Sequence, residues 1–309
     1  MELTVTGANA ITSPTLSAWN WELALYLFLG GMAGGVAVMS SILRLRKNGT
    51  MAEGEPARFT APLLIPVILA LGVFFVFLDL ERKINVFWLY LTFRPLSPMS
   101  WGSWSLLTFF PVSALNALSV LPDEYLEKLG FAPLKRFARS LRPHTRPLAV
   151  LNFAVGIFVA TYTGVLLSAF VARPLWNSAI LPMLFLASAL TAGAACMIIL
   201  ARQAKVKLFF LKLNVWILAA ELVIMPLFTI GQLTAHAHAL MPDFSFIYDY
   251  LLYGLAIILS LGILKGREEE HPLPATVSRR MLLCACLVLL GGLILRFTMV
   301  YEGQLSRLI

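Results

Sequence analysis

The sequence predicts an all-α integral membrane protein with eight transmembrane helices, and three observations carry that prediction. Of the 309 residues, 59% are hydrophobic and only 13% are charged. The mean hydropathy is +0.83. A soluble domain carries about 25% charged and about 45–50% apolar residues, so lipid must be part of the solvent here. The apolar residues form eight long runs with short polar or proline-rich segments between them, which indicates a single membrane domain over residues 1–309.

The first four predicted spans follow from run length alone. A helix needs roughly 20 apolar residues to cross ~30 Å of hydrocarbon. The first four runs of that length, in chain order, are residues 21–43, 60–80, 101–121 and 147–171.

The last four predicted spans are residues 177–200, 208–230, 246–264 and 281–300. The fifth run reads LFLASALTAGAACM from Leu184, which echoes LFLGGMAGGVAVM from Leu27 in the first run. Two explanations stay open. The chain contains a parallel repeat of two four-helix halves, or small residues recur because they let membrane helices pack closely.

The basic residues predict the orientation. Cytoplasmic loops of membrane proteins carry an excess of Lys and Arg. Of the 24 Lys and Arg residues, all but six fall in or around the loops after the first, third, fifth and seventh spans. Those loops are therefore expected to face the cytoplasm, with both termini on the non-cytoplasmic side. The six exceptions are Arg82, Lys83, Arg94, Arg173, Arg296 and Arg307.

Several classes of function are excluded by what the residues cannot form. The net charge of +8 is not arranged as a basic stripe with interleaved aromatics, so no nucleic-acid partner is expected. The three cysteines form no CxxC pair, so neither an iron–sulfur cluster nor a metal site is predicted. The histidines give no pair on facing helices at membrane depth, which argues against haem. They are His144, His236, His238 and His271.

Five polar residues that do not belong in lipid map to the non-cytoplasmic half of five different spans. An ionisable residue at membrane depth costs about 2.5–3.5 kcal/mol or more, so it indicates a functional site by default. Their convergence predicts one pocket open toward the outer leaflet. The five are Asn20, Asp79, Tyr162, Glu221 and Arg296.

Each of these residues also has a structural explanation that stays open. Glu221 can be a buried hydrogen-bond partner, and Arg296 can extend its charged end to the interface. Glu22 and Asn20 can belong to an interfacial belt at a helix start. Tyr162 needs a partner for its hydroxyl, and the neighbouring Thr163 and Gly164 are small enough to admit a planar ligand.

The predicted pocket suits a quinone. A quinone head group has two carbonyl oxygens that need donors and two protons to gain on reduction, and its tail needs access to lipid. We therefore expect Tyr162 and Arg296 to hold the head group, and Glu221 or Asp79 to relay protons. Because the chain has no redox centre of its own, electrons must come from a partner, and no catalytic residue is assigned to this chain alone.

At these residues the sequence resembles the NrfD/PsrC family, the membrane subunits of polysulfide reductase and formate-dependent nitrite reductase. The resemblance covers nearly the whole chain. Four segments in matching order carry it, namely Trp21 to Gly31, Asp79 to Gly102, Tyr162 to Leu186, and Leu295 to Gln304.

The resemblance implies eight helices in two four-helix bundles and a menaquinone or ubiquinone near the outer face. It implies a four-cluster iron–sulfur subunit on that face and, beyond it, a catalytic subunit that is often a molybdopterin oxidoreductase. Tyr162 corresponds to the quinone-binding tyrosine. Family members place an Asn and a His or acidic residue on the first helix, where Asn20 and Glu22 are nearest in this sequence and no His is present.

The leading hypothesis is thus a quinone-binding membrane-anchor subunit of a respiratory oxidoreductase complex in the bacterial inner membrane. Two alternatives come from other classes. A secondary transporter would show broken helices and a site at the midplane, whereas the polar residues here lie off-centre. A passive anchor would hold partner subunits without binding quinone.

Overall fold

The computed structural model describes residues 19–46, 54–80, 82–128, 130–234, 245–265 and 274–306. Within these ranges every regular element is a helix. Eight described helices are long and apolar enough to cross a membrane. They are α1 (Trp21–Leu45), α2 (Ala57–Asp79), α4 (Pro98–Val120), α7 (Thr145–Ser168), α8 (Leu181–Leu200), α9 (Ala204–Thr234), α10 (Ser245–Leu264) and α11 (Ala275–Leu305).

The predicted eight-helix architecture is confirmed, and the boundaries differ mainly where helices extend beyond the apolar run. The helices α9 and α11 each span 31 residues, longer than the predicted 208–230 and 281–300. Basic residues within the first two turns of each helix can stay helical because long side chains reach past the hydrocarbon. The helix α8 begins later than predicted because residues 173–178 form turns that are closed by backbone hydrogen bonds.

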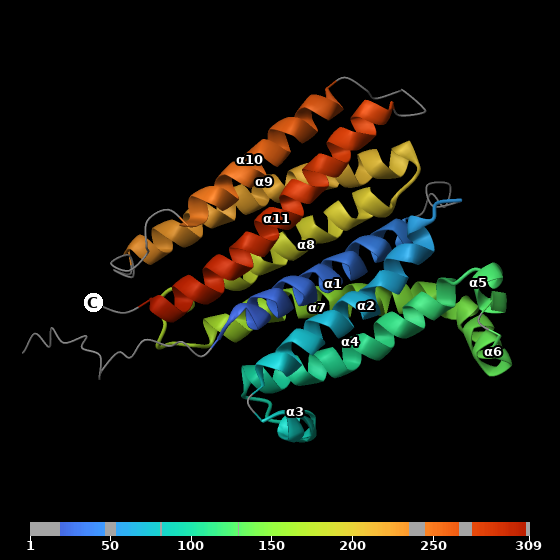
Figure 1. Cartoon of the computed structure of the whole chain (residues 1–309), viewed down its shortest axis with the longest axis horizontal. Helices are drawn as coiled ribbons and strands as arrows, with labels where there is room; N and C mark the ends of the chain where they lie inside the picture. The colour runs from blue at the N-terminus through green and yellow to red at the C-terminus, as the bar shows by residue number, and fades with distance from the viewer. Residues whose placement is uncertain are drawn as a thin grey trace, which may run out of the picture.

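Short helices lie at both ends of the bundle and were not expected from the sequence. The 3₁₀ turn η2 (Lys83–Asn85) and α3 (Val86–Leu91) follow α2. At the opposite end, α5 (Asp123–Lys128), α6 (Ala132–Leu141) and the turn η3 (Arg142–His144) lead into α7. Figure 1 shows α3 and α6 at opposite ends of the long helices. We call these the α3 end and the α6 end.

The α5–α6 corner is tied by one acidic residue. Asp123 accepts hydrogen bonds from Arg139 at 3.2 Å and from Arg142 at 3.0 Å. The hydrogen bond from Arg142, followed by that from Arg139, holds the pKa of Asp123 below its usual range. All three side chains are exposed, so this ion pair contributes little to stability.

The long helices form two groups of four. The helices α1, α2, α4 and α7 contact one another in one group, and α8, α9, α10 and α11 in the other. In Figure 1 the first group lies below and the second above, with α1 and α8 side by side between them. The first and last helices of each group also contact across the boundary, through α1 with α8 and α11 and through α7 with α8.

Glycines in α1 set how closely these groups approach. A Cβ on Gly34 would lie 2.7 Å from the carbonyl oxygen of Gly156 in α7. On the next face, a Cβ on Gly35 would overlap the Ala189 backbone of α8 and lie 3.1 Å from the backbone nitrogen of Gly193. The small-residue runs noticed in the sequence therefore meet each other at the α1–α8 crossing, as close helix packing requires.

The start of α1 and the end of α11 are joined at the α3 end of the bundle. The side chain of Gln304 accepts from the Trp19 backbone N–H at 2.9 Å and donates to the Trp19 carbonyl at 2.8 Å. The indole of Trp176 donates to the Met299 carbonyl at 2.6 Å, and its ring occupies the space above Gly303. These contacts hold the start of α1 and the end of α11 together. The prediction that both termini are non-cytoplasmic, and the single-domain prediction, stay predictions.

Candidate functional site

A small cavity opens beside Tyr162 in the first helix group. Its volume is about 200 Å³, and residues of α1, α2, α3, α4 and α7 line it. Most of the lining side chains are aliphatic or aromatic. The polar exceptions are Tyr26, Asp79, Tyr90, Ser103 and Tyr162, together with the indole of Trp19. The cavity is therefore an apolar slot with a few hydroxyl groups and one carboxylate.

The tyrosine is positioned by a glycine on the facing helix. Tyr162 is buried in α7, only 5% exposed. A Cβ added at Gly102 of α4 would overlap the hydroxyl and ring of Tyr162, so the ring lies against bare backbone there. The hydroxyl also lies within hydrogen-bonding range of the Gly102 backbone. Gly102 thus decides where the Tyr162 hydroxyl points.

Replacing Gly102 with alanine is expected to displace Tyr162 and weaken binding of any ligand in the cavity. A new Cβ that overlaps a buried ring costs roughly 1–3 kcal/mol when the ring must shift, which is about a 5- to 150-fold loss of affinity if the cost falls on the bound state. Affinity measured by quenching of a fluorescent quinol analogue checks this. Gly262→Ala is the matched control, because nothing lies within 4 Å of the added atom. Equal affinities in the two variants would show that the contact between Gly102 and the Tyr162 ring does not affect binding in the cavity.

Two carboxylates lie near the opening of this cavity. Asp79 ends α2 and lines the cavity, and Glu22 in the first turn of α1 is close enough to interact with it electrostatically. The structure therefore brings two carboxylates together at this edge of the cavity.

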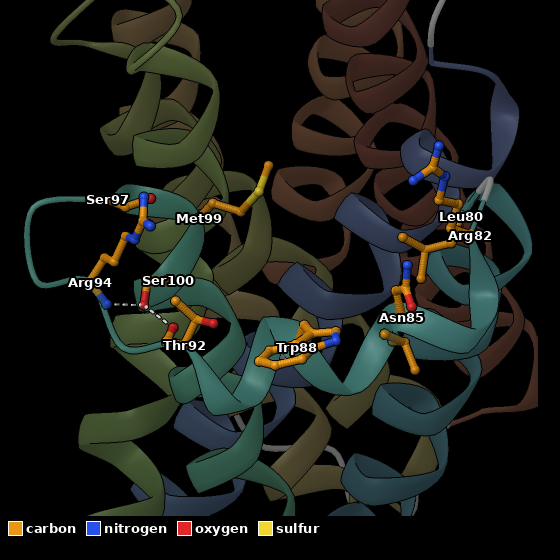
Figure 2. Close-up of a pocket in the computed structure, with 10 residues that line it drawn as sticks. Leu80, Arg82, Asn85, Trp88, Thr92, Arg94, Ser97, Met99 and Ser100 are labelled. Carbon is orange, nitrogen blue, oxygen red and sulfur yellow. Dashed lines mark hydrogen bonds between the residues drawn. The ribbon is translucent and has the colours of Figure 1, made fainter.

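A wider bowl lies outside the cavity at the α3 end. Its volume is about 560 Å³. Leu80 and Met99 line both the bowl and the cavity, so the two hollows are neighbours. Figure 2 shows Trp88 of α3 across the floor of the bowl, with Arg94 at one side and Arg82 at the other. The loop under Arg94 is held by Ser100, whose hydroxyl accepts from the Arg94 N–H at 3.0 Å and donates to the Thr92 carbonyl at 3.3 Å.

The tyrosine on α3 borders the same space. Tyr90 lines the Tyr162 cavity, and partial burial raises the pKa of its hydroxyl. The hydroxyl therefore keeps its proton across the physiological range and acts as a hydrogen-bond donor. Sequence reasoning missed Tyr90 because it lies in a segment interpreted as a connecting loop.

Arg296 and Glu221 are not part of this cavity. The expectation of one pocket shared with Tyr162 is wrong, since neither residue is among those that line it. Arg296 of α11 lies over the Phe185 ring, 3.8 Å from its centroid, and donates to the Phe185 carbonyl at 3.1 Å. Glu221 of α9 accepts from the Thr191 hydroxyl of α8 at 3.2 Å. Both residues therefore make their contacts on α8, inside the second helix group.

Three other predicted residues lie away from the Tyr162 cavity, and two of them have local structural roles. Asn20 is exposed at the start of α1 and makes no side-chain cap. The Thr163 hydroxyl donates to the Ala160 carbonyl of its own helix at 3.0 Å. A Cβ on Gly164 would lie 2.5 Å from the Cα of Pro182, so Gly164 permits contact between α7 and α8. None of the three lines the Tyr162 cavity.

Two residues near Glu221 were not expected from the sequence. Asp249 and Tyr253 are fully buried on α10 and interact electrostatically with Glu221 and Arg296. Their spacing of four residues was an available signal, because it places both on one helix face. Asp249 was overlooked because it stands between two tyrosines near the predicted start of its span, which resembles an interfacial segment. His236, His238 and His271 lie outside the described residues.

Comparison with known proteins identifies the family. The family described as "Polysulphide reductase, NrfD" matches residues 9–307. The chain belongs to this family. The NrfD-type fold agrees with the eight membrane-spanning helices described above. The chain is accordingly a multi-pass protein of the bacterial inner membrane.

Three curated relatives are similar to this NrfD-family chain. A polysulfide reductase chain of Wolinella succinogenes is 34% identical over 178 residues, which cover 57% of this chain and 55% of the relative. This match therefore spans about half of the relative's length. Protein NrfD of Escherichia coli is 28% identical, with 93% of this chain and 95% of the relative covered. A tetrathionate reductase subunit of Salmonella typhimurium is 29% identical, with 69% and 58% covered. These relationships support a membrane-anchor role.

Proposed function

We propose that this NrfD-family chain is the quinone-binding membrane-anchor subunit of a respiratory oxidoreductase. In this role it exchanges electrons between the menaquinone or ubiquinone pool and an iron–sulfur partner. The observation that carries the proposal is the apolar cavity with a buried tyrosine hydroxyl and a carboxylate at its mouth. A bound quinone supplies the two-electron, two-proton chemistry that this chain's side chains lack.

The cavity suits a ring-shaped head group with a tail outside. Pockets for drug-sized ligands measure about 300–1,000 Å³, and about 200 Å³ is closer to the space that one head group fills. The apolar walls exclude water, and Tyr162 would donate a hydrogen bond to one carbonyl oxygen of a bound quinone. Such a bond counts for more in a desolvated site than in water.

The carboxylates have a separate task at the cavity mouth. Asp79 borders the cavity and Glu22 lies beside it, so a proton can pass from the bowl to the cavity through the pair. Arg296 is not assigned to the head group, since it lies outside this cavity, and Asn20, Thr163 and Gly164 are not assigned as ligands.

The α3 end is the proposed docking face for the partner. Arg82 and Arg94 flank the bowl, and large apolar side chains stand out around it, with Ile84 86% exposed and Leu96 98% exposed. Exposed apolar groups rimmed by charge are typical of protein contact sites. An iron–sulfur subunit bound there would lie next to the quinone cavity, with a molybdopterin subunit beyond it as the proposed catalytic partner.

The Tyr162→Phe variant tests the proposal. It keeps the ring and removes only the hydroxyl, so affinity for a fluorescent quinol analogue should fall by roughly 5- to 30-fold, the equivalent of about 1–2 kcal/mol for one buried hydrogen bond. Asp79→Asn should retain binding and slow quinol turnover in the assembled complex. Tyr301→Phe is the matched control, because Tyr301 is exposed on α11.

Wild-type affinity in Tyr162→Phe would overturn the proposed site. Absence of analogue binding by the wild-type complex would overturn quinone binding itself and favour the passive anchor. Substrate flux through the purified chain in vesicles, without partners, would favour the transporter.

A further inference from the structure

The α8–α11 half encloses a cluster of ionisable side chains that the proposed quinone site does not use. Glu221 comes from α9, Asp249 and Tyr253 from α10, and Arg296 from α11. Glu221, Asp249 and Tyr253 are 0% exposed and Arg296 is 2% exposed. Such residues in a membrane protein are costly, and they persist where they serve ion or proton movement.

The cluster has far more hydrogen-bonding capacity than its described neighbours satisfy. Neither oxygen of Asp249 has a hydrogen-bond partner among the described residues. The hydroxyl groups of Tyr253 and Ser188 lie near Glu221, but neither makes a hydrogen bond of good geometry to its Oε1. Arg296 uses Nη2 for the Phe185 carbonyl, while Nε and Nη1 have no partner in the described structure. A purely structural network would satisfy such groups, because unsatisfied buried polar atoms each cost about 1–3 kcal/mol.

The charges do not balance when every group is in its ordinary ionised form. Glu221 and Asp249 would contribute two negative charges, and Arg296 contributes one positive charge. The groups that face them from neighbouring helices add no charge at neutral pH, since they are hydroxyl groups of Ser188, Thr191, Tyr250 and Tyr253. From α1, Gly31 faces Arg296, since a Cβ on Gly31 would lie 3.5 Å from Nη2 of Arg296.

One added proton makes the cluster neutral. A net charge buried in a low-dielectric medium is strongly disfavoured, and two carboxylates close together titrate as a pair that shares one proton. We propose that Glu221, Asp249 and Arg296 form a proton-binding site, separate from the quinone cavity, that holds one exchangeable proton between the two carboxylates. The proton enters and leaves as H⁺, so no electron transfer takes place at this site.

Polar residues extend from this site toward the α6 end. Asn214 lies seven residues before Glu221 on α9, so the two share a helix face about 10 Å apart along the axis. Asn214 is fully buried, and its amide has no partner among the described residues. Seven residues earlier, Lys207 donates to the Ser278 hydroxyl of α11 at 3.0 Å. On α10, the buried Ser260 continues the face of Asp249 and Tyr253.

These residues give the site access from the side opposite the quinone cavity. The cavity and its bowl open at the α3 end, whereas the face with Lys207, Asn214 and Glu221 leads from the α6 end. A polar residue buried at such depth is expected to line a water-accessible path. Proton exchange at Glu221 and Asp249 therefore runs through α9, independently of the protons taken up at the quinone.

Infrared difference spectroscopy of the purified full-length protein tests the shared proton. In addition to the band from the carboxylates at the quinone cavity, the wild type should show at neutral pH the carbonyl stretch of one protonated carboxyl in the Glu221–Asp249 pair. Glu221→Gln and Asp249→Asn should each lose that band, because the remaining carboxylate then pairs with Arg296 in its ionised form. Arg296→Gln should roughly double the band, since both carboxyls then bind protons. Asp123→Asn is the control, because Asp123 is exposed and ion-paired.

Three outcomes would overturn the inference. An unchanged band in both Glu221→Gln and Asp249→Asn would show that the cluster holds no proton. A loss of quinol-analogue affinity in those variants as large as in Tyr162→Phe would show that the sites are not separate. A deuterium-exchange rate of the band that is unchanged in Asn214→Leu, in place of a slowing by at least about tenfold, would refute the access route. Failure of Tyr162→Phe to alter quinol binding would count against the quinone site and leave this inference standing.

Discussion

Replacing Gly35 with alanine should lower the free energy of unfolding by about 3 kcal/mol, the upper part of the usual range for overpacking. The new Cβ would overlap the Ala189 carbonyl and press on the Gly193 backbone. Both are backbone atoms, so no side-chain rotation can relieve the overlap. The two helix groups would have to separate along α1 and α8, which would open the boundary between the proposed quinone site and the proton-binding cluster.

Unfolding in a denaturant–detergent titration measures this effect. Gly254→Ala in α10 is the matched control, since a Cβ there has nothing within 4 Å and should stabilise the helix by up to about 1 kcal/mol. A Gly193→Ala variant should behave like Gly35→Ala, because its Cβ would overlap the backbone of Gly35. If Gly35→Ala unfolds at the same denaturant concentration as the control, α1 and α8 do not cross at this point.

Replacing Glu55 with alanine should cost about 3 kcal/mol of stability through the loss of charge-assisted hydrogen bonds. Glu55 is 3% exposed and lies just before α2. Its carboxylate accepts from the backbone N–H groups of Arg202 at 2.9 Å and Gln203 at 2.7 Å, and from that of Ala57 at 3.2 Å. One side chain thus caps the start of α2 and joins it to the start of α9, where the helix dipole also favours a negative charge.

The same titration of Glu55→Ala and Glu55→Gln distinguishes the contribution of the negative charge from that of the hydrogen-bond acceptor. Glutamine keeps one oxygen acceptor, so we expect it to lose less stability than alanine does. Glu124→Ala is the control, since Glu124 is exposed on α5 and surface changes of this kind stay within about 0.5 kcal/mol. Equal stability of Glu55→Ala and Glu124→Ala would show that the link between the α1–α2 and α8–α9 loops does not support the fold.

Residue type alone indicated which side chains are unusual in the membrane, but not which of them share a cavity. Tyr162 and Asp79 stood out because a phenol and a carboxylate are rare in apolar runs, and the structure brings both to one cavity. Arg296 and Glu221 stood out for the same reason and lie in a different helix group. Depth along a helix can be counted from its ends, but the direction in which a side chain points around the axis cannot.

Glu55 and Asp249 show why part of the site stayed hidden. Glu55 lies in a segment interpreted as a polar loop, and only the fold brings the α8–α9 turn against it. Asp249 lies near a predicted span end, where a charge is ordinary. The local sequence does not distinguish a carboxylate exposed to water from one that is buried near Arg296.

The sequence by itself determined that lipid surrounds the protein, because its composition is too apolar for water. Run length determined the number of helices and their approximate ends, and the order of short motifs determined the family resemblance. The tertiary structure decided which helix faces meet. In a soluble helix, an apolar stripe marks the buried side, but in lipid both the buried and the exposed faces are apolar, so the pattern does not indicate rotation. Close contacts at Gly34, Gly35 and Gly102 set that rotation. They place Tyr162 in one half of the molecule and the Glu221–Asp249–Arg296 cluster in the other.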